Sequence, residues 1–207
     1  MSKLPTVAII GQANVGKSSL FNRLTRSRTA IVAREAGTTR DNVVGKVSYK
    51  RRNVDSAPSD DYSQFWLIDT AGLKTAEDEF EATIQDQIAD ASAAADVILV
   101  TVDSTAYPSD ADRQLAKKAL KSGKPVILIA NKADLKGSLS IDEFKRLGIK
   151  TIIKTSAEHS IGISELLDDI AELIPPATET APDDIIRVAL IGRPNVGKSN
   201  LFNTLAG

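Results

Sequence analysis

The chain has 207 residues, of which 42% are hydrophobic, enough to bury the core of one α/β domain but not of two complete domains. Its 26 Lys and Arg residues nearly balance its 27 Asp and Glu residues, so no general basic excess marks a nucleic-acid-binding surface. The lack of cysteine excludes disulfides and thiolate metal sites. No apolar run approaches the roughly 20 residues that span a bilayer, and no signal-peptide core precedes the first apolar run. We therefore expect a cytoplasmic protein with no membrane partner.

Apolar, strand-like runs alternate with amphipathic, helix-like runs, a pattern typical of a mostly parallel sheet with helices on both faces. Six strands are predicted, at Thr6–Ile10, Asn42–Lys50, Phe65–Ile68, Asp96–Val102, Pro125–Ala130 and Thr151–Lys154. Helices are predicted at Lys17–Thr25, Phe80–Ala94, Asp110–Lys121, Ile141–Leu147 and Gly162–Leu173. We interpret the polar segment Arg26–Arg40 as a loop and Arg51–Asp61 as a surface excursion within a hairpin.

The first strand runs directly into Gly11-Gln12-Ala13-Asn14-Val15-Gly16-Lys17-Ser18, which has the spacing of a phosphate-binding P-loop. Small residues let successive backbone N–H groups turn toward a phosphate, and the following helix adds the positive end of its dipole. Lys17 supplies a mobile cation, and the Ser18 hydroxyl can ligate Mg²⁺. The predicted nucleotide contacts in this stretch are Gly11, Asn14, Val15, Gly16, Lys17, Ser18 and Ser19.

Three further motifs follow the ends of predicted strands, where a doubly wound sheet forms its ligand crevice. Asp69-Thr70-Ala71-Gly72 supplies a carboxylate that can reach Mg²⁺ through water, and the Gly72 N–H can meet a γ-phosphate. In Asn131-Lys132-Ala133-Asp134, one carboxylate can accept from two N–H groups of guanine, which adenine does not offer. Ser156-Ala157-Glu158 can present the Ala157 N–H to the guanine carbonyl. Together the four motifs predict binding of GTP or GDP with Mg²⁺.

The P-loop occurs twice in this chain. Thirteen of the nineteen positions of Val7–Thr25 are identical at Val188–Ala206, at a constant offset of 188 − 7 = 181. The second copy supplies Gly192, Asn195, Gly197, Lys198 and Ser199. A repeat this long indicates duplicated domains rather than a solenoid. We expect a first domain at 1–174, an extended linker at 175–184, and the truncated start of a second domain at 185–207 that cannot close a core or bind nucleotide.

With Ala36-Gly37-Thr38-Thr39-Arg40-Asp41, these motifs resemble those of the Der (EngA) family of tandem-domain GTPases. The resemblance implies a P-loop NTPase G domain that hydrolyses GTP, acts in assembly of the large subunit of the bacterial ribosome and has that subunit and its RNA as partners. We expect a monomer. The resemblance places Lys17 on the β- and γ-phosphates, Ser18 and Thr39 on Mg²⁺, and Asp69 on the same metal through water, with Thr38 as the rival of Thr39. Asn131 and Asp134 would hold guanine, with Lys132 along its plane.

Small signalling GTPases often carry a glutamine that positions water directly after the Asp-x-x-Gly glycine. This chain has Leu73 at that position. An aliphatic side chain cannot orient water, so charge compensation must come from another source. The resemblance suggests K⁺ held partly by Asn14, and Lys17, Asn14, Thr39 and Gly72 are the predicted catalytic set. The alternative is that Asn14 only caps the loop through local hydrogen bonds.

Two other functions stay open on the sequence alone. The first is a GTPase component of a tRNA-modification system, against which the second P-loop argues. The second is a non-hydrolysing, guanine-nucleotide-sensing adaptor, which Leu73 leaves possible. His159 is interpreted as a surface residue rather than a general base, because it follows the motif assigned to guanine. The lysines of the predicted helix 110–121 are interpreted as a solvated face, with RNA contact as the alternative.

Overall fold

A computed structural model describes residues 4–26, 32–33, 43–50, 62–69 and 95–174. All of them lie in one compact unit, Lys3–Ala177. The described strands are β1 (Thr6–Gly11), β2 (Val32–Ala33), β3 (Val43–Lys50), β4 (Tyr62–Asp69), β5 (Val97–Asp103), β6 (Val126–Asn131) and β7 (Thr151–Lys154). The described helices are α1 (Lys17–Arg26), α3 (Asp110–Lys121), α4 (Ile141–Phe144) and α5 (Ile163–Leu173), with a 3₁₀ turn η1 (Lys145–Leu147) after α4.

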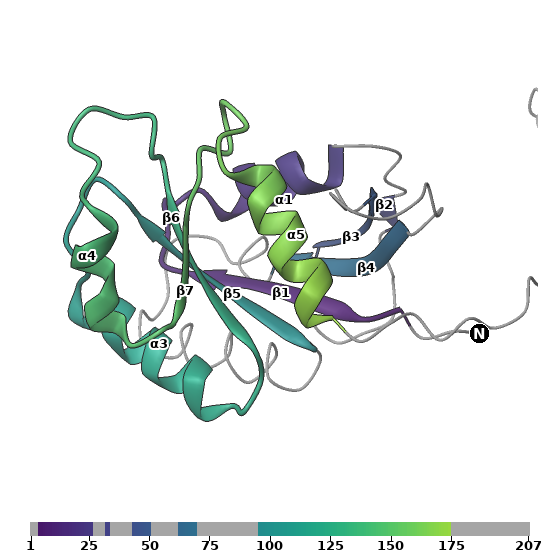
Figure 1. Ribbon diagram of the computed structural model, residues 1–207, viewed down its shortest axis with the longest axis horizontal. Coiled ribbons are helices and arrows are strands. Elements are labelled where there is room, and N and C mark those ends of the chain that lie inside the picture. Colours follow the sequence, from purple (N-terminus) through teal and green to yellow (C-terminus); the bar gives the residue numbers. More distant parts are fainter. Residues whose placement is uncertain (1–3, 27–31, 34–42, 51–61, 70–94, 175–207) are drawn as a thin grey trace, which may run out of the picture. The chain divides into compact units, whose positions relative to one another are not determined.

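The described strands form one sheet in the order β2-β3-β4-β1-β5-β6-β7 (Figure 1). The neighbours from β4 through β7 pair in parallel, whereas β3 pairs antiparallel with both β2 and β4. The predicted strands and the mostly parallel sheet are therefore confirmed. The expected count of six is one short, because β2 lies inside the segment interpreted as a loop. It has only two residues, paired with Val44 and Gly45, and two residues carry no periodicity that a sequence pattern can reveal.

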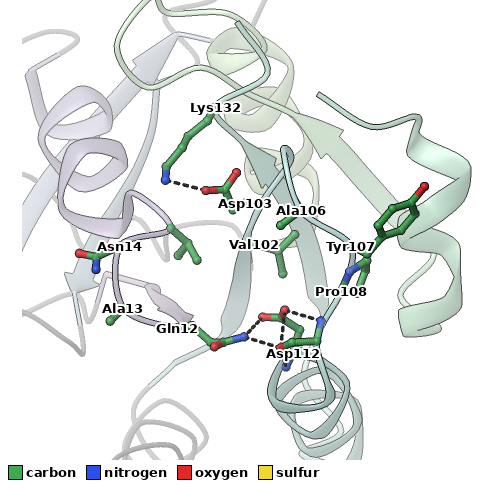
Figure 2. A pocket seen from close by; sticks show the side chains of 12 residues that line it. Gln12, Ala13, Asn14, Val102, Asp103, Ala106, Tyr107, Pro108, Asp112 and Lys132 are labelled. Atoms are coloured by element: carbon green, nitrogen blue, oxygen red, sulfur yellow. Dashed lines mark hydrogen bonds and ion pairs between the residues drawn. The ribbon is translucent and has the colours of Figure 1, made fainter. Parts of the chain in front are cut away.

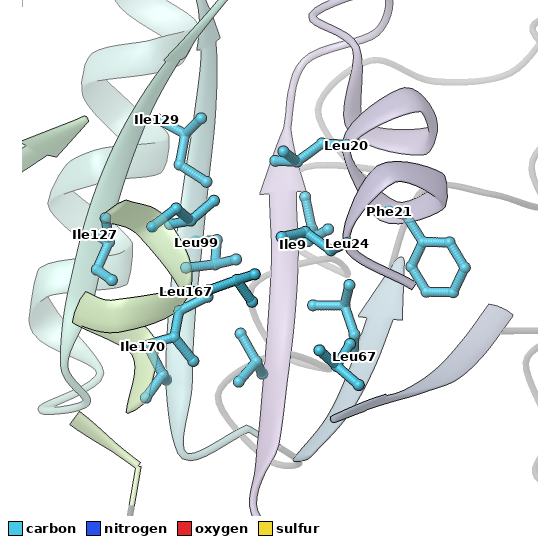
Figure 3. Packing of buried hydrophobic residues seen from close by; sticks show 14 of the residues in the cluster. Ile9, Leu20, Phe21, Leu24, Leu67, Leu99, Ile127, Ile129, Leu167 and Ile170 are labelled. Carbon is cyan, nitrogen blue, oxygen red and sulfur yellow. The ribbon is translucent and has the colours of Figure 1, made fainter. Parts of the chain in front are cut away.

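Helices cover both faces of the sheet, as predicted (Figure 1). Successive side chains of a strand point to opposite faces. In β1, Ile9 therefore joins the cluster under α1 and α5, and Ile10 joins the cluster under α3 and α4. Figure 3 shows the first cluster, with Leu20 and Leu24 of α1 packed against the same strands as Leu167 of α5. This burial fixes α1, and with it the residues at its N-terminus, against the sheet.

Local signals explain where the described helices begin and end. α3 begins with a capping box, in which the Ser109 side chain accepts from the N–H of Asp112 while the Asp112 carboxylate accepts from the N–H of Ser109. The predicted helix 141–147 is one α-helical turn continued by η1, and Gly148 ends it with a φ of +77°. No helix within the described ranges is long and apolar enough to cross a membrane.

The carboxyl ends of the central strands meet at one edge of the sheet. The parallel registers pair Gly11 with Thr101 and Asp103 with Asn131, and place Ile9 beside Asp69. The residues that end β1, β4, β5 and β6 are therefore neighbours, although up to 120 positions separate them in the sequence (131 − 11 = 120). This edge is where a doubly wound sheet binds its ligands.

Candidate functional site

The loop between β1 and α1 has the backbone that a phosphate loop requires. Gly16 adopts a φ of +93° and Asn14 a φ of +63°, and Asn is one of the few residues with a side chain that tolerates this region. The Gly16 carbonyl accepts from the N–H of Leu20 at 2.9 Å, so α1 begins directly at the loop. The helix N-terminus therefore faces the same space as the loop N–H groups, an arrangement suited to an anion.

Lys17 is buried within this loop, with 6% of its surface exposed. Its ammonium donates to the backbone carbonyl of Gln12 at 2.5 Å. Burial lowers the pKa of Lys17, and the nearby Asp69 carboxylate acts in the opposite direction. A buried cation turned back onto its own loop is suited to a phosphate, which can supply the negative charge that burial otherwise disfavours.

An oxygen pair beside Lys17 fits Mg²⁺. The Ser18 hydroxyl donates to Asp69 Oδ2 at 3.0 Å, and Asp69 is buried at the end of β4. Hydroxyl and carboxylate oxygens are the ligands that Mg²⁺ prefers. Within the described ranges no three His, Cys, Asp or Glu side chains gather to hold a metal. The remaining ligands must come from phosphate, from water or from a residue such as the predicted Thr39.

Asn131, at the end of β6, joins three segments through one buried amide. Its Nδ2 donates to the Val15 carbonyl of the phosphate loop at 3.0 Å. Its Oδ1 accepts from the Thr155 hydroxyl at 3.1 Å and from the Ala157 N–H at 3.2 Å. A guanine carbonyl that accepts from the Ala157 N–H would therefore share this donor with Asn131 Oδ1, or would displace Asn131 Oδ1 from it.

Lys132 and Asp134 follow Asn131 on the same side of the sheet. Lys132 has a φ of +65°, and its ammonium pairs with Asp103 Oδ2 at 2.6 Å, as Figure 2 shows. A hydrogen bond from the Ser156 side chain lowers the pKa of Asp134, which keeps this carboxylate in its accepting, ionised form. His159 lies 3.5 Å from Asp134, with 60% of its side chain exposed. His159 thus lies at the end of the candidate site that is predicted to bind guanine.

A hollow of about 280 Å³ lies between the phosphate loop and the segment that leads into α3 (Figure 2). On one side of it, Gln12 Nε2 donates to Ser109 Oγ and to Asp112 Oδ1, both at 2.7 Å. The capping box of α3 is thus attached to the phosphate loop. Asn14 is exposed, and Figure 2 shows its side chain directed away from the Lys132–Asp103 pair.

The structure thus brings together the predicted residues of the phosphate loop, of the Asn131 motif and of the Ser156 motif. It adds Asp69, the carboxylate of the Asp-x-x-Gly motif. These are Gly11, Asn14, Val15, Gly16, Lys17, Ser18, Ser19, Asp69, Asn131, Lys132, Asp134, Ser156, Ala157 and Glu158. Other predicted positions lie outside the described residues, namely Thr38, Thr39, Gly72, Leu73, the helix 80–94, the excursion 51–61, the linker 175–184, and the second P-loop with Gly192, Asn195, Gly197, Lys198 and Ser199.

Three residues of the site were missed by the sequence analysis. Asp103 ends an apolar strand just as Asp69 and Asn131 do, and that position was an available signal. Gln12 and Arg23 carried no such signal. Arg23, on α1, donates from Nε to the Ala157 carbonyl and from Nη2 to the Glu158 carbonyl, each at 2.6 Å.

A phosphate loop with a buried lysine, an oxygen pair at the end of β4 and an Asn-Lys-x-Asp set at the end of β6 define this fold as a P-loop GTPase G domain. A family model described as "50S ribosome-binding GTPase" matches residues 6–132 and 187–207. The chain belongs to that family. The second match, residues 187–207, covers the whole repeated segment, so the repeat is a second occurrence of the same family sequence.

Individual relatives agree with this assignment. "GTPase Der" of Gemmatimonas aurantiaca is 41% identical over 207 residues, which cover 99% of this chain and 44% of the relative. The chain thus spans less than half the length of such relatives, and the resemblance to the Der family is confirmed. Among solved structures, a variant of Era from Aquifex aeolicus bound to GDP·AlF₄⁻ has a TM-score of 0.62 and 28% identity, covering 91% of this chain and 62% of that one. Era in complex with MgGDPNP and a segment of 16S ribosomal RNA has a TM-score of 0.61 and 26% identity, covering 89% of this chain and 61% of that one.

The close approach of Gly16 to Asn131 predicts a matched pair of outcomes. Gly16 and Gly137 share a φ of +93°, so alanine at either position should lose about 1–2 kcal/mol of unfolding free energy through backbone strain. A Cβ at Gly137 meets nothing within 4 Å, whereas a Cβ at Gly16 would overlap Asn131 Nδ2. We expect Gly16→Ala to lose about 1–3 kcal/mol more than Gly137→Ala, because Asn131 must leave a buried partner.

Urea unfolding of both variants measures the difference, and fluorescence titration with a labelled GDP tests the site. We expect the Gly16→Ala variant to bind GDP more weakly and the Gly137→Ala variant to bind it normally. Equal loss of stability in the two variants, with equal GDP binding, would show that the Asn131 contact does not hold the loop.

Proposed function

We propose that this chain binds GTP with Mg²⁺ and hydrolyses it to GDP and phosphate, as part of a longer protein that acts in assembly of the large ribosomal subunit. The observation that carries the proposal is the Asn131 amide, which ties the phosphate loop to the Ala157 segment and so joins a phosphate site to a base site. The family model, which is described as a 50S ribosome-binding GTPase, supports the ribosomal role. The two matched segments support tandem domains. In this proposal the first domain spans 1–174, the linker 175–184, and the start of the second domain 185–207.

At the phosphate end, each group has a distinct task. Lys17 leaves the Gln12 carbonyl for the β- and γ-phosphate oxygens, where its charge offsets the charge that develops during transfer. The Ser18 hydroxyl would hold Mg²⁺, and the Asp69 carboxylate beside it would act on the same metal through water. Thr39 and the Gly72 N–H would complete the set from segments outside the described residues. Mg²⁺ held there would supply positive charge that offsets the negative charge of the phosphates.

At the base end, the Asp134 carboxylate accepts from the ring N–H and the exocyclic amine of guanine. Adenine presents no such pair of donors, so ATP would leave the carboxylate oxygens unsatisfied. The Ser156 side chain favours the ionised form of Asp134 by hydrogen bonding to it. Lys132, held at Asp103, lies along the base plane in this proposal.

Hydrolysis proceeds without a catalytic glutamine, because Leu73 stands where that residue would be. The Asn14 side-chain oxygen would help to hold K⁺, which would supply the missing positive charge. Two observations support this assignment: Asn14 is exposed at the phosphate loop, and its side chain is directed away from the base end (Figure 2). The positive φ of Asn14 also explains an asparagine there on backbone grounds alone, so the ion must be tested directly.

The first prediction from this proposal concerns base recognition. Asp134→Asn replaces an acceptor with an amide that can donate, so GTP affinity should fall about 10- to 100-fold, and affinity for xanthosine triphosphate should rise. Competition against a labelled GDP measures both values. Asp142→Asn is the matched control, since Asp142 is an exposed aspartate of α4 that pairs with Lys145. Unchanged preference for GTP over the xanthine nucleotide in Asp134→Asn would contradict the proposed base site.

The second prediction concerns potassium. Single-turnover GTP hydrolysis should be about tenfold or more faster in potassium than in sodium at equal ionic strength, and Asn14→Ala should remove that difference. Asn14→Gly is the control for the backbone, because glycine keeps the positive φ and also lacks the oxygen. Both variants should lose the potassium response. A response that survives in either variant would exclude Asn14 as the ion's ligand, and no turnover in either salt would favour the non-hydrolysing adaptor.

The third prediction concerns the ribosome. Cosedimentation of this chain with purified large subunits should be stronger with a non-hydrolysable GTP analogue than with GDP, because the γ-phosphate orders segments that GDP leaves free. Lys17→Ala should abolish the nucleotide dependence through loss of phosphate binding. Equal sedimentation in the two nucleotide states would argue against nucleotide-gated binding by this chain.

A further inference from the structure

Arg23 attaches α1 to the loop that follows β7. Its Nε donates to the Ala157 carbonyl and its Nη2 to the Glu158 carbonyl, each at 2.6 Å. Two donors of one planar guanidinium thus reach two successive carbonyls. Such charge-assisted, two-point hydrogen bonds are short and directional, and a flexible single-point cation does not reproduce them. Arg23 therefore fixes both the position and the orientation of this part of the loop.

The loop itself, residues 156–161, is closed at its base. Ser156 and Ile161 exchange backbone hydrogen bonds of 3.0 and 3.2 Å, and the His159 N–H donates to the Ser156 hydroxyl. Within this closed loop, Ala157 is held from two sides. Its N–H donates to Asn131 Oδ1 from one side, and its carbonyl accepts from Arg23 on the other.

We propose that Arg23 is a positioning residue for guanine recognition, acting through the Ala157 peptide. The proposal rests on the proposed function, in which the Ala157 N–H faces the guanine carbonyl. α1 begins with Lys17 and Ser18 at the phosphate end, and Arg23 lies 23 − 17 = 6 residues farther on, about 9 Å along the helix axis. One helix, packed on the sheet through Leu20 and Leu24, therefore links the phosphate end of the site to its base end.

The duplicated sequence supplies the test substitution. At the offset of 181, Arg23 corresponds to 23 + 181 = 204, and that residue is Thr204. Threonine has neither the reach nor the charge to bond two carbonyls across this distance. Arg23→Thr therefore removes the attachment with a residue that the same chain carries at the matching position of the repeated sequence.

The experiment compares two ligands that differ at one atom. GDP and 6-thioguanosine diphosphate share every base contact except the one facing Ala157, where sulfur, a weak acceptor, replaces oxygen. Affinities are measured by competition against a labelled GDP, using the full chain. The variants are Arg23→Thr, Arg23→Lys and the control Arg113→Thr, which alters a half-exposed helix arginine paired with Asp110.

We expect the unaltered chain to prefer GDP, because its Ala157 N–H is held in place. Arg23→Thr should weaken GDP binding about 10- to 100-fold and the thio ligand much less, so the preference disappears. Arg23→Lys should lose part of the preference, because one ammonium can reach a carbonyl without fixing its orientation. Arg113→Thr should change neither affinity. If Arg23→Thr fails to fold, as judged by circular dichroism, Arg23→Lys provides the same comparison.

Two results would overturn the proposal. One is GDP binding by Arg23→Thr as tight as that by Arg113→Thr. The other is equal weakening of both ligands, which indicates general damage to the site rather than positioning of the Ala157 peptide. Failure of the unaltered chain to bind GDP would instead refute the proposed function, and this inference with it. The two failures are distinguished by that one measurement.

Discussion

The site depends on the buried amide of Asn131. This side chain donates to the phosphate loop through the Val15 carbonyl and accepts from Thr155 and Ala157, so one residue joins its own strand, β6, to two segments that lie far from it in the sequence. A buried amide that loses a partner costs about 1–3 kcal/mol, so none of the three segments can move alone without that penalty. Gly16 makes the arrangement possible, because any larger residue would overlap the Asn131 nitrogen.

The apolar packing explains how charged groups can be held so closely at this edge. Alternate residues of β1 and β5 enter separate clusters on the two faces of the sheet, so the strand ends are fixed relative to one another. α1 is packed on one face by Leu20 and Leu24, and this holds Lys17 and Ser18 at its N-terminus. Lys17 is thereby kept buried near Asp69 although burial lowers its pKa. A flexible loop would instead let that ammonium return to water.

Much of this could be predicted from the sequence because the signals are local. The buried strands read as apolar runs, and the phosphate loop is defined by a fixed spacing of glycines and lysine. The edge strand β2 was missed because two residues have no periodicity. Arg23 and Gln12 were missed for a different reason. Their partners lie 134 and 97 or more positions away, so only the folded sheet brings them together. Asn131 was predicted as a guanine ligand, but its hydrogen bonds to Val15, Thr155 and Ala157 were not predicted, because those partners lie 24 or more positions away.

The comparison of the two P-loop sequences shows where they differ. The glycines, Lys17 and Ser18 are the same in both copies. Among the differences, Gln12, Ala13, Ser19 and Arg23 are replaced by Arg193, Pro194, Asn200 and Thr204. In the first copy, Gln12 and Arg23 attach the phosphate loop and its helix to α3 and to the 156–161 loop. The phosphate-binding lysine and the serine that follows it are thus shared, whereas Gln12 and Arg23, which hold the surroundings in place in the first copy, are not. Differences in nucleotide handling between two such domains would then arise from these attachments and from the Ser19 position, because the shared glycines, lysine and serine cannot produce them.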